Sequence, residues 1–179
     1  MAFPNSFTTA RLRVERLTPG HWDAIRQMDS DTAFMSLLGG IRTVDESRAY
    51  MDRNLKHWDQ YGFGLWILHD TAGQIIGRGA IRHLDVEGTD EVELGYGFYP
   101  THWGKGLATE IAKQFLDLGL TALRLRTMVG ITRHANIGSR RVLEKTGLVY
   151  ERDIVEHGVP HMLYRYTSGE DVIRAGSSR

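Results

Sequence analysis

The stretch Trp103-Gly104-Lys105-Gly106-Leu107-Ala108-Thr109 decides the fold of this chain, because it joins a strand pattern that ends at Pro100 to a helix pattern that begins near Thr109. Two glycines with one residue between them allow the backbone to turn its N–H groups inward. The helix that follows adds unsatisfied N–H donors and the positive end of its dipole. This segment, called the glycine turn below, predicts a pyrophosphate site, although most turns of this kind only change the direction of the chain.

Three strand patterns precede the glycine turn. Residues 63–68 and 74–82 flank a predicted hairpin turn at residues 70–73. Residues 91–99 follow a polar loop at residues 88–90. Because short connections join antiparallel neighbours, we expect an antiparallel meander that leads directly into the glycine turn.

The remaining elements follow from the spacing of apolar residues. Alternation predicts strands at residues 12–17, 123–131, 149–156 and 161–167. Helical spacing predicts helices at about residues 19–28, 44–61, 109–119 and 137–145. Thr43 or Asp45 would cap the second of these helices, and Gly62 would end it. The order predicts one α/β domain of the α+β type over residues 1–168, with a mixed, mostly antiparallel sheet flanked by helices, and a frayed tail at residues 169–179.

The composition of the 179 residues argues against several classes of protein. The 22 basic and 22 acidic residues cancel, so the chain has no general attraction for nucleic acid or an anionic membrane. No window approaches 18 uninterrupted apolar residues. The absence of cysteine excludes disulfides, thiolate nucleophiles and thiolate metal sites, and it fits a reducing compartment. We therefore expect a soluble, cytoplasmic protein with neither a nucleic-acid nor a membrane partner.

Four blocks of the sequence, in this order, resemble the Gcn5-related N-acetyltransferases (GNAT), in the branch that includes the ribosomal-protein N-terminal (RimJ/RimL-like) acetyltransferases. The blocks are Thr9-Ala-Arg-Leu-Arg-Val, Val92-Glu-Leu-Gly-Tyr-Gly-Phe-Tyr-Pro, Trp103-Gly-Lys-Gly-Leu-Ala-Thr-Glu, and Asn136-Ile-Gly-Ser-Arg-Arg-Val-Leu-Glu-Lys-Thr-Gly-Leu. The resemblance spans nearly the whole chain. It implies a sheet whose central strands splay apart, and the transfer of an acetyl group from acetyl-coenzyme A (acetyl-CoA) to a primary amine, either a peptide N-terminus or a small molecule.

The resemblance also implies which residues bind acetyl-CoA. Backbone amides of the glycine turn would hold the pyrophosphate, the backbone of residues 96–98 would pair with the pantetheine arm, and Asn136 would contact that arm. Asn136 can also cap a helix, and Lys105 can equally remain a solvated loop residue. Trp103 departs from the Gln or Arg of many members. The full set is Tyr96, Gly97, Phe98, Trp103, Gly104, Lys105, Gly106, Leu107, Ala108, Thr109 and Asn136.

Acetyl transfer by direct attack needs a neutral amine, a polarised thioester and a proton for the departing sulfur. In many relatives a Tyr seven residues beyond the Asn is the general acid, but Leu143 occupies that position here. Ser139 matches the Ser considered as the acid in the named branch, and it can alternatively be a local hydrogen-bond partner of the backbone. Glu93 is the candidate base, and the alternative is a structural ion pair.

The eight histidines show no recognised metal-site spacing. His157 and His161 are four residues apart, but Gly158 and Pro160 between them argue against a shared helical face. We therefore expect no metal.

Two alternatives to an acetyltransferase stay open, as does the oligomeric state. The chain is either an enzyme or a catalytically silent domain that binds acyl-CoA, and an enzyme can use another donor such as succinyl-CoA. Residues 31–51, 84–90 and 157–162 are expected to flank the amine acceptor, and a homodimer is compatible with the sequence.

Overall fold

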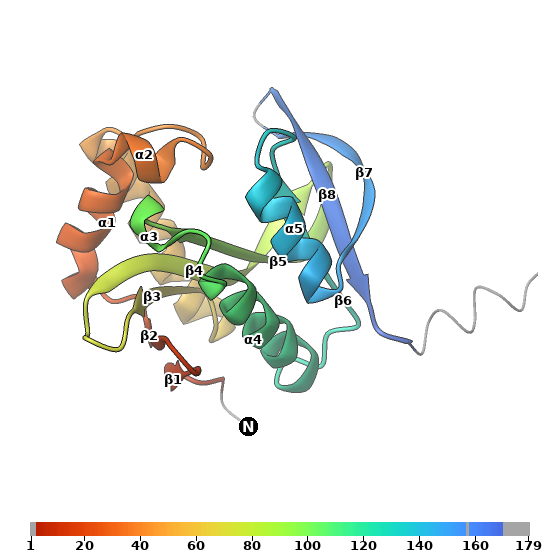
Figure 1. The fold of residues 1–179 in the computed structure, drawn as a ribbon, viewed down its shortest axis with the longest axis horizontal. Helices are drawn as coiled ribbons and strands as arrows, with labels where there is room; N and C mark the ends of the chain where they lie inside the picture. Colours follow the sequence, from red (N-terminus) through yellow and green to blue (C-terminus); the bar gives the residue numbers. More distant parts are fainter. Residues whose placement is uncertain (1–2, 157, 170–179) are drawn as a thin grey trace, which may run out of the picture.

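Eight strands form one sheet in the computed structural model, which describes residues 3–156 and 158–169 (Figure 1). The strands are β1 (Ser6–Thr8), β2 (Arg13–Arg16), β3 (Leu65–His69), β4 (Ile75–Val86), β5 (Thr89–Phe98), β6 (Thr127–Thr132), β7 (Val149–Glu156) and β8 (Val159–Thr167). Their spatial order is β1-β2-β3-β4-β5-β6-β8-β7. Neighbours are antiparallel except β5 and β6, which confirms the predicted mixed, mostly antiparallel sheet.

Helices cover both faces of the sheet. They are the 3₁₀ turns η1 (Pro19–His21) and η2 (Pro100–His102) and the helices α1 (Trp22–Ser30), α2 (Thr32–Met35), α3 (Val44–Tyr61), α4 (Leu107–Thr121) and α5 (Ile137–Thr146). Two neighbours on β4 identify the faces, since successive strand residues point to opposite sides. Arg78 bonds Asp29 of α1, whereas Gly79 lies against Phe115 of α4. Helices α1 to α3 therefore lie on one face, and α4 with its neighbour α5 on the other (Figure 1).

Helix α3 has the bounds that the sequence predicts, because its two ends carry local signals. The Thr43 side chain accepts a hydrogen bond from the Glu46 amide, and the Glu46 carboxylate accepts one from the Thr43 amide at 2.7 Å. This capping box selects Thr43 over Asp45 as the cap, and removing such a cap typically costs about 1 kcal/mol. Gly62 ends the helix at φ 74°, in the left-handed region that favours glycine.

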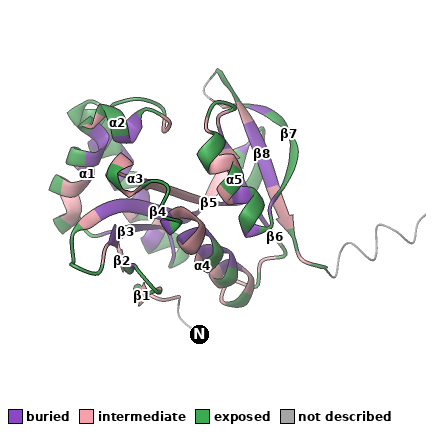
Figure 2. Ribbon diagram, viewed as in Figure 1, coloured by how far each residue is buried: buried purple, intermediate pink, exposed green. Residues whose placement is uncertain are grey.

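The core lies between the sheet and its two helical layers (Figure 2). Trp66 of β3 is fully buried and stacks on Phe115 of α4, with ring centroids 5.2 Å apart. Gly79 makes room for this stack, since a Cβ there would lie 2.6 Å from the Phe115 ring. The stack therefore fixes α4, and with it the glycine turn that precedes α4, against the sheet.

Two predicted boundaries near the end of α4 are wrong. The strand predicted at residues 123–131 begins only at Thr127, because Arg124 has a φ of 55° that no strand accepts. The helix predicted to end near Gly119 continues to Thr121. Gly119 is a packing residue instead, since a Cβ there would lie 2.2 Å from the Met128 sulfur.

Other differences concern two short elements and the β4–β5 hairpin. β1 and α2 carry no periodic signal long enough to predict, and β4 and β5 extend into the region expected as a polar loop, leaving only Glu87 and Gly88 as the turn. The tail expected at residues 169–179 lies outside the described residues except for Gly169. None of the described helices has the length and apolar character needed to span a membrane.

Candidate active site

The two central strands diverge. β5 and β6 are parallel neighbours that meet at a single pair of residues, Glu93 and Val129, whereas β5 pairs with β4 over its whole length. Beyond Glu93, the edge of β5 that faces β6 is therefore not paired with another strand. Residues 96–98 lie along this free edge, where an extended chain could add as a further strand.

The glycine turn follows β5 and presents its backbone amides to solvent. Gly104 and Gly106 have φ angles of 71° and 78°, which glycine adopts without strain. No side chain caps α4 at Gly106. The six consecutive amides from Gly104 to Thr109 donate to no other described residue. Residues 104–106 are exposed, so the amides and the positive end of the α4 dipole form a site suited to an anion.

The side chains of the glycine turn have separate structural roles. Trp103 donates from its indole Nε1 to the Phe98 carbonyl at 2.8 Å, which ties the turn to the end of β5. Lys105 is exposed and forms no ion pair with the described residues, whereas Leu107 is buried in the core. An anion at the turn would therefore meet mainly backbone groups.

A brace from the N-terminal segment holds the glycine turn from outside. Arg11 donates from Nη1 to the Lys105 carbonyl at 2.6 Å and from Nε to Glu110 at 2.7 Å. The Thr9 hydroxyl and the Arg11 amide donate to the other oxygen of Glu110. Thr9 and Arg11 belong to the first of the four sequence blocks. Their role cannot be predicted from the sequence, because their partners are about a hundred residues away.

Ser139 and Asn136 meet at the start of α5, on the face that carries α4. Asn136 caps the helix by accepting from the Ser139 amide at 3.0 Å, so its predicted capping role is confirmed. The Ser139 hydroxyl lies 3.1 Å from the phenol oxygen of Tyr96 on β5. Burial raises the pKa of the Tyr96 phenol well above its ordinary value, although the hydrogen bond to Ser139 opposes this shift. The phenol therefore stays protonated and can donate a hydrogen bond.

Leu143 occupies the position at which the resemblance implies a tyrosine acid in many relatives. Its side chain is 1% exposed and packs over Gly130 of β6. A Cβ at Gly130 would lie 2.4 Å from a Leu143 methyl group. Leu143 is thus a core residue, and the hydroxyls at this end of the site belong to Tyr96 and Ser139.

Glu93 lies on the opposite face of β5, the one covered by α1 to α3. Its Oε2 accepts from Nε of Arg82 at 2.9 Å, and the pair is partly shielded from solvent. The Glu93 carboxylate raises the pKa of the Arg82 guanidinium. The second oxygen, Oε1, accepts no hydrogen bond from another described residue. Glu93 therefore combines the structural ion pair foreseen as an alternative with one oxygen left free.

Two glycines on β5 shape the space beside Glu93. The three atoms nearest to a Cβ at Gly95 all belong to the Glu93 side chain, at 3.8 to 3.9 Å, so this position has room for a side-chain carbon. A Cβ at Gly97 would lie 2.8 Å from Leu38 and 3.2 Å from Phe34. Residues 31–51, expected to flank the acceptor, thus cover Gly97 and leave Gly95 open. Residues 84–90 form the β4–β5 hairpin, and His157 lies outside the described residues.

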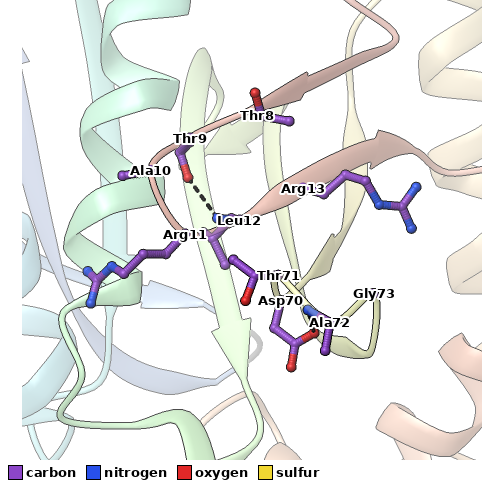
Figure 3. A pocket seen from close by; sticks show the side chains of 10 residues that line it. All are labelled: Thr8, Thr9, Ala10, Arg11, Leu12, Arg13, Asp70, Thr71, Ala72 and Gly73. Carbon is purple, nitrogen blue, oxygen red and sulfur yellow. Dashed lines mark hydrogen bonds between the residues drawn. The ribbon is translucent and has the colours of Figure 1, made fainter.

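A hollow of about 410 Å³ lies elsewhere, between the β1–β2 turn and the β3–β4 turn (Figure 3). Residues 8–13 and 70–73 line it, and it includes none of the predicted site residues. Arg11 belongs to this rim and also reaches the glycine turn. Among the described residues, no group of three His, Asp or Glu side chains is arranged to hold a metal ion.

Comparisons with known proteins agree with this geometry. A family model described as an acetyltransferase (GNAT) domain matches residues 11–149. The protein YkkB of Bacillus subtilis (strain 168), which is described as uncharacterized, is 30% identical over 140 residues, covering 78% of this chain and 81% of that protein.

Solved structures share the fold at lower sequence identity. An acetyltransferase from Agrobacterium tumefaciens strain C58 superimposes with a TM-score of 0.81 at 24% identity, covering 94% of this chain and 96% of the other. The ribosomal L7/L12 alpha-N-protein acetyltransferase RimL, in complex with coenzyme A, has a TM-score of 0.73 at 15% identity, with coverages of 92% and 97%. Spermidine N-acetyltransferase from Vibrio cholerae, in complex with coenzyme A and spermine, has a TM-score of 0.71 at 19% identity, with coverages of 90% and 98%.

The family model covers most of the chain, including the splayed strands, the glycine turn and α5. The chain therefore belongs to the GNAT acetyltransferase family and is an N-acetyltransferase.

Proposed function

We propose that this enzyme binds acetyl-CoA at the glycine turn and transfers the acetyl group directly to a primary amine. The observation that carries the proposal is the run of six free amides from Gly104 to Thr109, next to the point where β5 and β6 separate. Bound acetyl-CoA would supply the acetyl group as an activated thioester. The chain has no cysteine, so a thiol nucleophile of the protein takes no part.

The proposed binding residues divide into two groups. The turn Trp103 to Thr109 would hold the pyrophosphate through backbone amides, with Trp103 fixing the turn to β5 through the Phe98 carbonyl. Residues 96–98 would offer the free edge of β5 to the pantetheine arm. Asn136 would contact the same arm, because it stands at the start of α5 on the far side of the divergence.

Glu93 is the proposed base. Its carboxylate lies beside Gly95, with Oε1 free and Arg82 holding the other oxygen in place. A carboxylate with one oxygen fixed and one free can accept a proton from the amine, either directly or through one water. Glu93 lies on the face opposite Ser139, so the acceptor and the donor would approach β5 from opposite sides.

Ser139 is the proposed acid, with its proton held at Oγ. The Asn136 cap fixes the Ser139 backbone, and the Tyr96 phenol lies within hydrogen-bond distance of both Oγ and the Ser139 carbonyl. When the phenol donates to Oγ, the serine proton is free to move toward a developing thiolate. Tyr96 acts through Ser139 in this scheme and is a positioning residue.

A peptide N-terminus is the proposed acceptor. Among the structural neighbours, RimL is named for a ribosomal protein and the Vibrio cholerae enzyme for spermidine. Arg82 beside Glu93 favours the peptide, because a guanidinium attracts the carbonyl oxygen next to an α-amine. A polyamine offers no such carbonyl oxygen to the guanidinium.

The test is turnover, measured as release of free thiol from acetyl-CoA with peptides and with spermidine. The proposal predicts release with peptides that carry a free α-amine and little or none with spermidine. Peptides with an acetylated N-terminus and no lysine serve as the matched control. Binding of acetyl-CoA without thiol release from any amine would instead indicate a silent binding domain, and release from succinyl-CoA alone would change the donor.

A further inference from the structure

Arg11 is a charged side chain that reaches the glycine turn from another part of the chain. It leaves the β1–β2 turn toward α4, whereas Arg13 leaves the same segment in the opposite direction (Figure 3). Two of its side-chain nitrogens are fixed, Nη1 by the Lys105 carbonyl and Nε by Glu110. The side chain is still 49% exposed, so it lies at the surface of the site rather than in the core.

Glu110 makes this arginine important for an anion site. Its carboxylate lies in the first turn of α4, where a negative charge is favourable for the helix dipole but repels a bound phosphate. Burial opposes ionisation of Glu110, yet the hydrogen bonds from Thr9 and Arg11 lower its pKa, so the carboxylate is charged. Arg11 is the cation that compensates this charge.

The third nitrogen of Arg11 is free. Nη2 forms no hydrogen bond with the described residues and lies 3.4 Å from the position that a Cβ on Gly106 would occupy. A guanidinium whose other nitrogens are fixed loses little side-chain entropy when it binds a phosphate. The fork is therefore held at the glycine turn with the nitrogen Nη2 unused.

We propose that Arg11 is a phosphate-binding residue of the cofactor site, acting through Nη2 and by compensating Glu110. This inference rests on the proposed function, in which the glycine turn holds the pyrophosphate of acetyl-CoA. It extends that site to the N-terminal segment. Arg11 keeps the anion site positive while it holds the Lys105 carbonyl.

The first test is calorimetric titration with coenzyme A of the parent, Arg11→Gln and Arg13→Ala. Glutamine places its amide nitrogen where Arg11 has Nε, so it retains a donor toward Glu110 but removes the charge and both Nη groups. We expect Arg11→Gln to raise the Kd by about 10- to 100-fold, the range for losing a charge-assisted hydrogen bond. Arg13→Ala removes an equally exposed arginine from the same segment and should leave the Kd unchanged. If Arg11→Gln does not fold, Arg11→Lys takes its place in the titration. Lysine keeps the charge but not the fork, so it should raise the Kd, by less than the range expected for Arg11→Gln.

A second readout separates phosphate binding from a purely structural role. S-acetylpantetheine carries the thioester without any phosphate, so Arg11→Gln should lower kcat/KM with acetyl-CoA and leave kcat/KM with S-acetylpantetheine unchanged. A structural role would lower both values. Glu110→Gln in the Arg11→Gln background should recover part of the lost affinity, because it removes the uncompensated carboxylate.

The outcomes also separate this inference from the proposed function. If the parent binds coenzyme A and Arg11→Gln binds it equally well, the inference is wrong and the proposed function stands. Equal losses with the two donors would also overturn the inference. If the folded parent binds no coenzyme A, the proposed function itself fails, and the assignment of Arg11 fails with it.

Discussion

The phenol oxygen of Tyr96 on β5 lies 3.1 Å from the hydroxyl of Ser139 on α5. The contact joins the strand at the free edge of the sheet to the first turn of the helix beside it. Tyr96→Phe should keep the packing and lower kcat by about fivefold, the loss expected for one neutral hydrogen bond. The Kd for acetyl-CoA should not change. A kcat equal to that of the parent would exclude a positioning role for Tyr96.

Ser139→Ala removes the hydroxyl proposed as the acid. Its amide still donates to Asn136, so the helix cap remains and the fold should be preserved. We expect kcat to fall by about 100-fold, at the lower end for loss of a general acid. Steady-state thiol release checks this, with Ser168→Ala as a control that lies outside the site. If Ser139→Ala retains full activity, the proton comes from another group.

Glu93→Gln removes the proposed base while keeping the size of the side chain. Turnover should fall by about 100-fold or more, and the Kd for acetyl-CoA should stay nearly unchanged because Glu93 faces the acceptor side. Glu91→Gln is the matched control, since Glu91 lies two residues earlier on the same face and pairs with Arg165 instead. Unchanged turnover in Glu93→Gln would mean that the role of Glu93 is its structural ion pair with Arg82 and not proton transfer.

Gly95→Val tests where the acceptor enters. Gly95 does not have a positive φ, and a Cβ there meets only Glu93 at ordinary contact distance, so a side chain is tolerated locally. The valine should fill the open position, raise the KM for the amine by about tenfold and leave the Kd for acetyl-CoA unchanged. An unchanged KM for the amine would move the acceptor path away from this face.

Much of the fold can be predicted from local signals, and helix α3 shows why. Thr43 and Glu46 cap its first turn and Gly62 ends its last turn, so each signal lies next to the helix end that it sets. Gly119 and Arg124 mislead because their roles depend on distant contacts or on an unusual φ. In sequence alone, a glycine that packs against the Met128 sulfur looks the same as a glycine that ends a helix.

The candidate site, like the fold, has one part that the sequence predicts and one part that it does not. The amides of the glycine turn are predictable, because a glycine pattern and the helix behind it are contiguous in sequence. The side-chain pairs are not. Tyr96 meets Ser139 across 43 residues and Arg11 meets Glu110 across 99, and such pairings depend on how the strands and helices pack. Spacing could place Glu93 on a strand but could not show that Arg82 of the neighbouring strand holds one of its oxygens.

Protonation of His57 should lower the free energy of unfolding in mild acid. Its Nε2 accepts from the His83 amide at 3.0 Å, so Nδ1 carries the proton and donates to the Phe63 carbonyl at 2.7 Å. Burial lowers the pKa of His57, the bond to Phe63 opposes this shift, and the nearby charges of His83 and Arg82 lower the pKa further. The ring is therefore neutral in the folded protein, and a second proton would break the bond to His83.

The sign of the pH effect follows from this shift. The folded-state pKa of His57 lies below the ordinary value of 6.5, so the unfolded state binds the proton first as the pH falls. The contribution of His57 to the free energy of unfolding is complete above pH 6.5 and is lost progressively below it. Urea denaturation of the parent and His57→Gln between pH 5 and 8, about the range in which a histidine titrates, checks this prediction. Parallel curves for the two proteins would contradict it.

The central claim is that the glycine turn binds acetyl-CoA through its backbone amides. Gly104→Val with Gly106→Val places side chains at two positions of positive φ, where valine is strained and the amides must move. Gly88→Val is the matched control, because Gly88 has a similar φ of 86° in the β4–β5 turn, at the end of β5 opposite to the glycine turn. The most direct measurement is calorimetric titration of these three proteins with acetyl-CoA. The account predicts binding by the parent and by Gly88→Val, and loss of binding by a folded double variant. Equal binding by all three would contradict it.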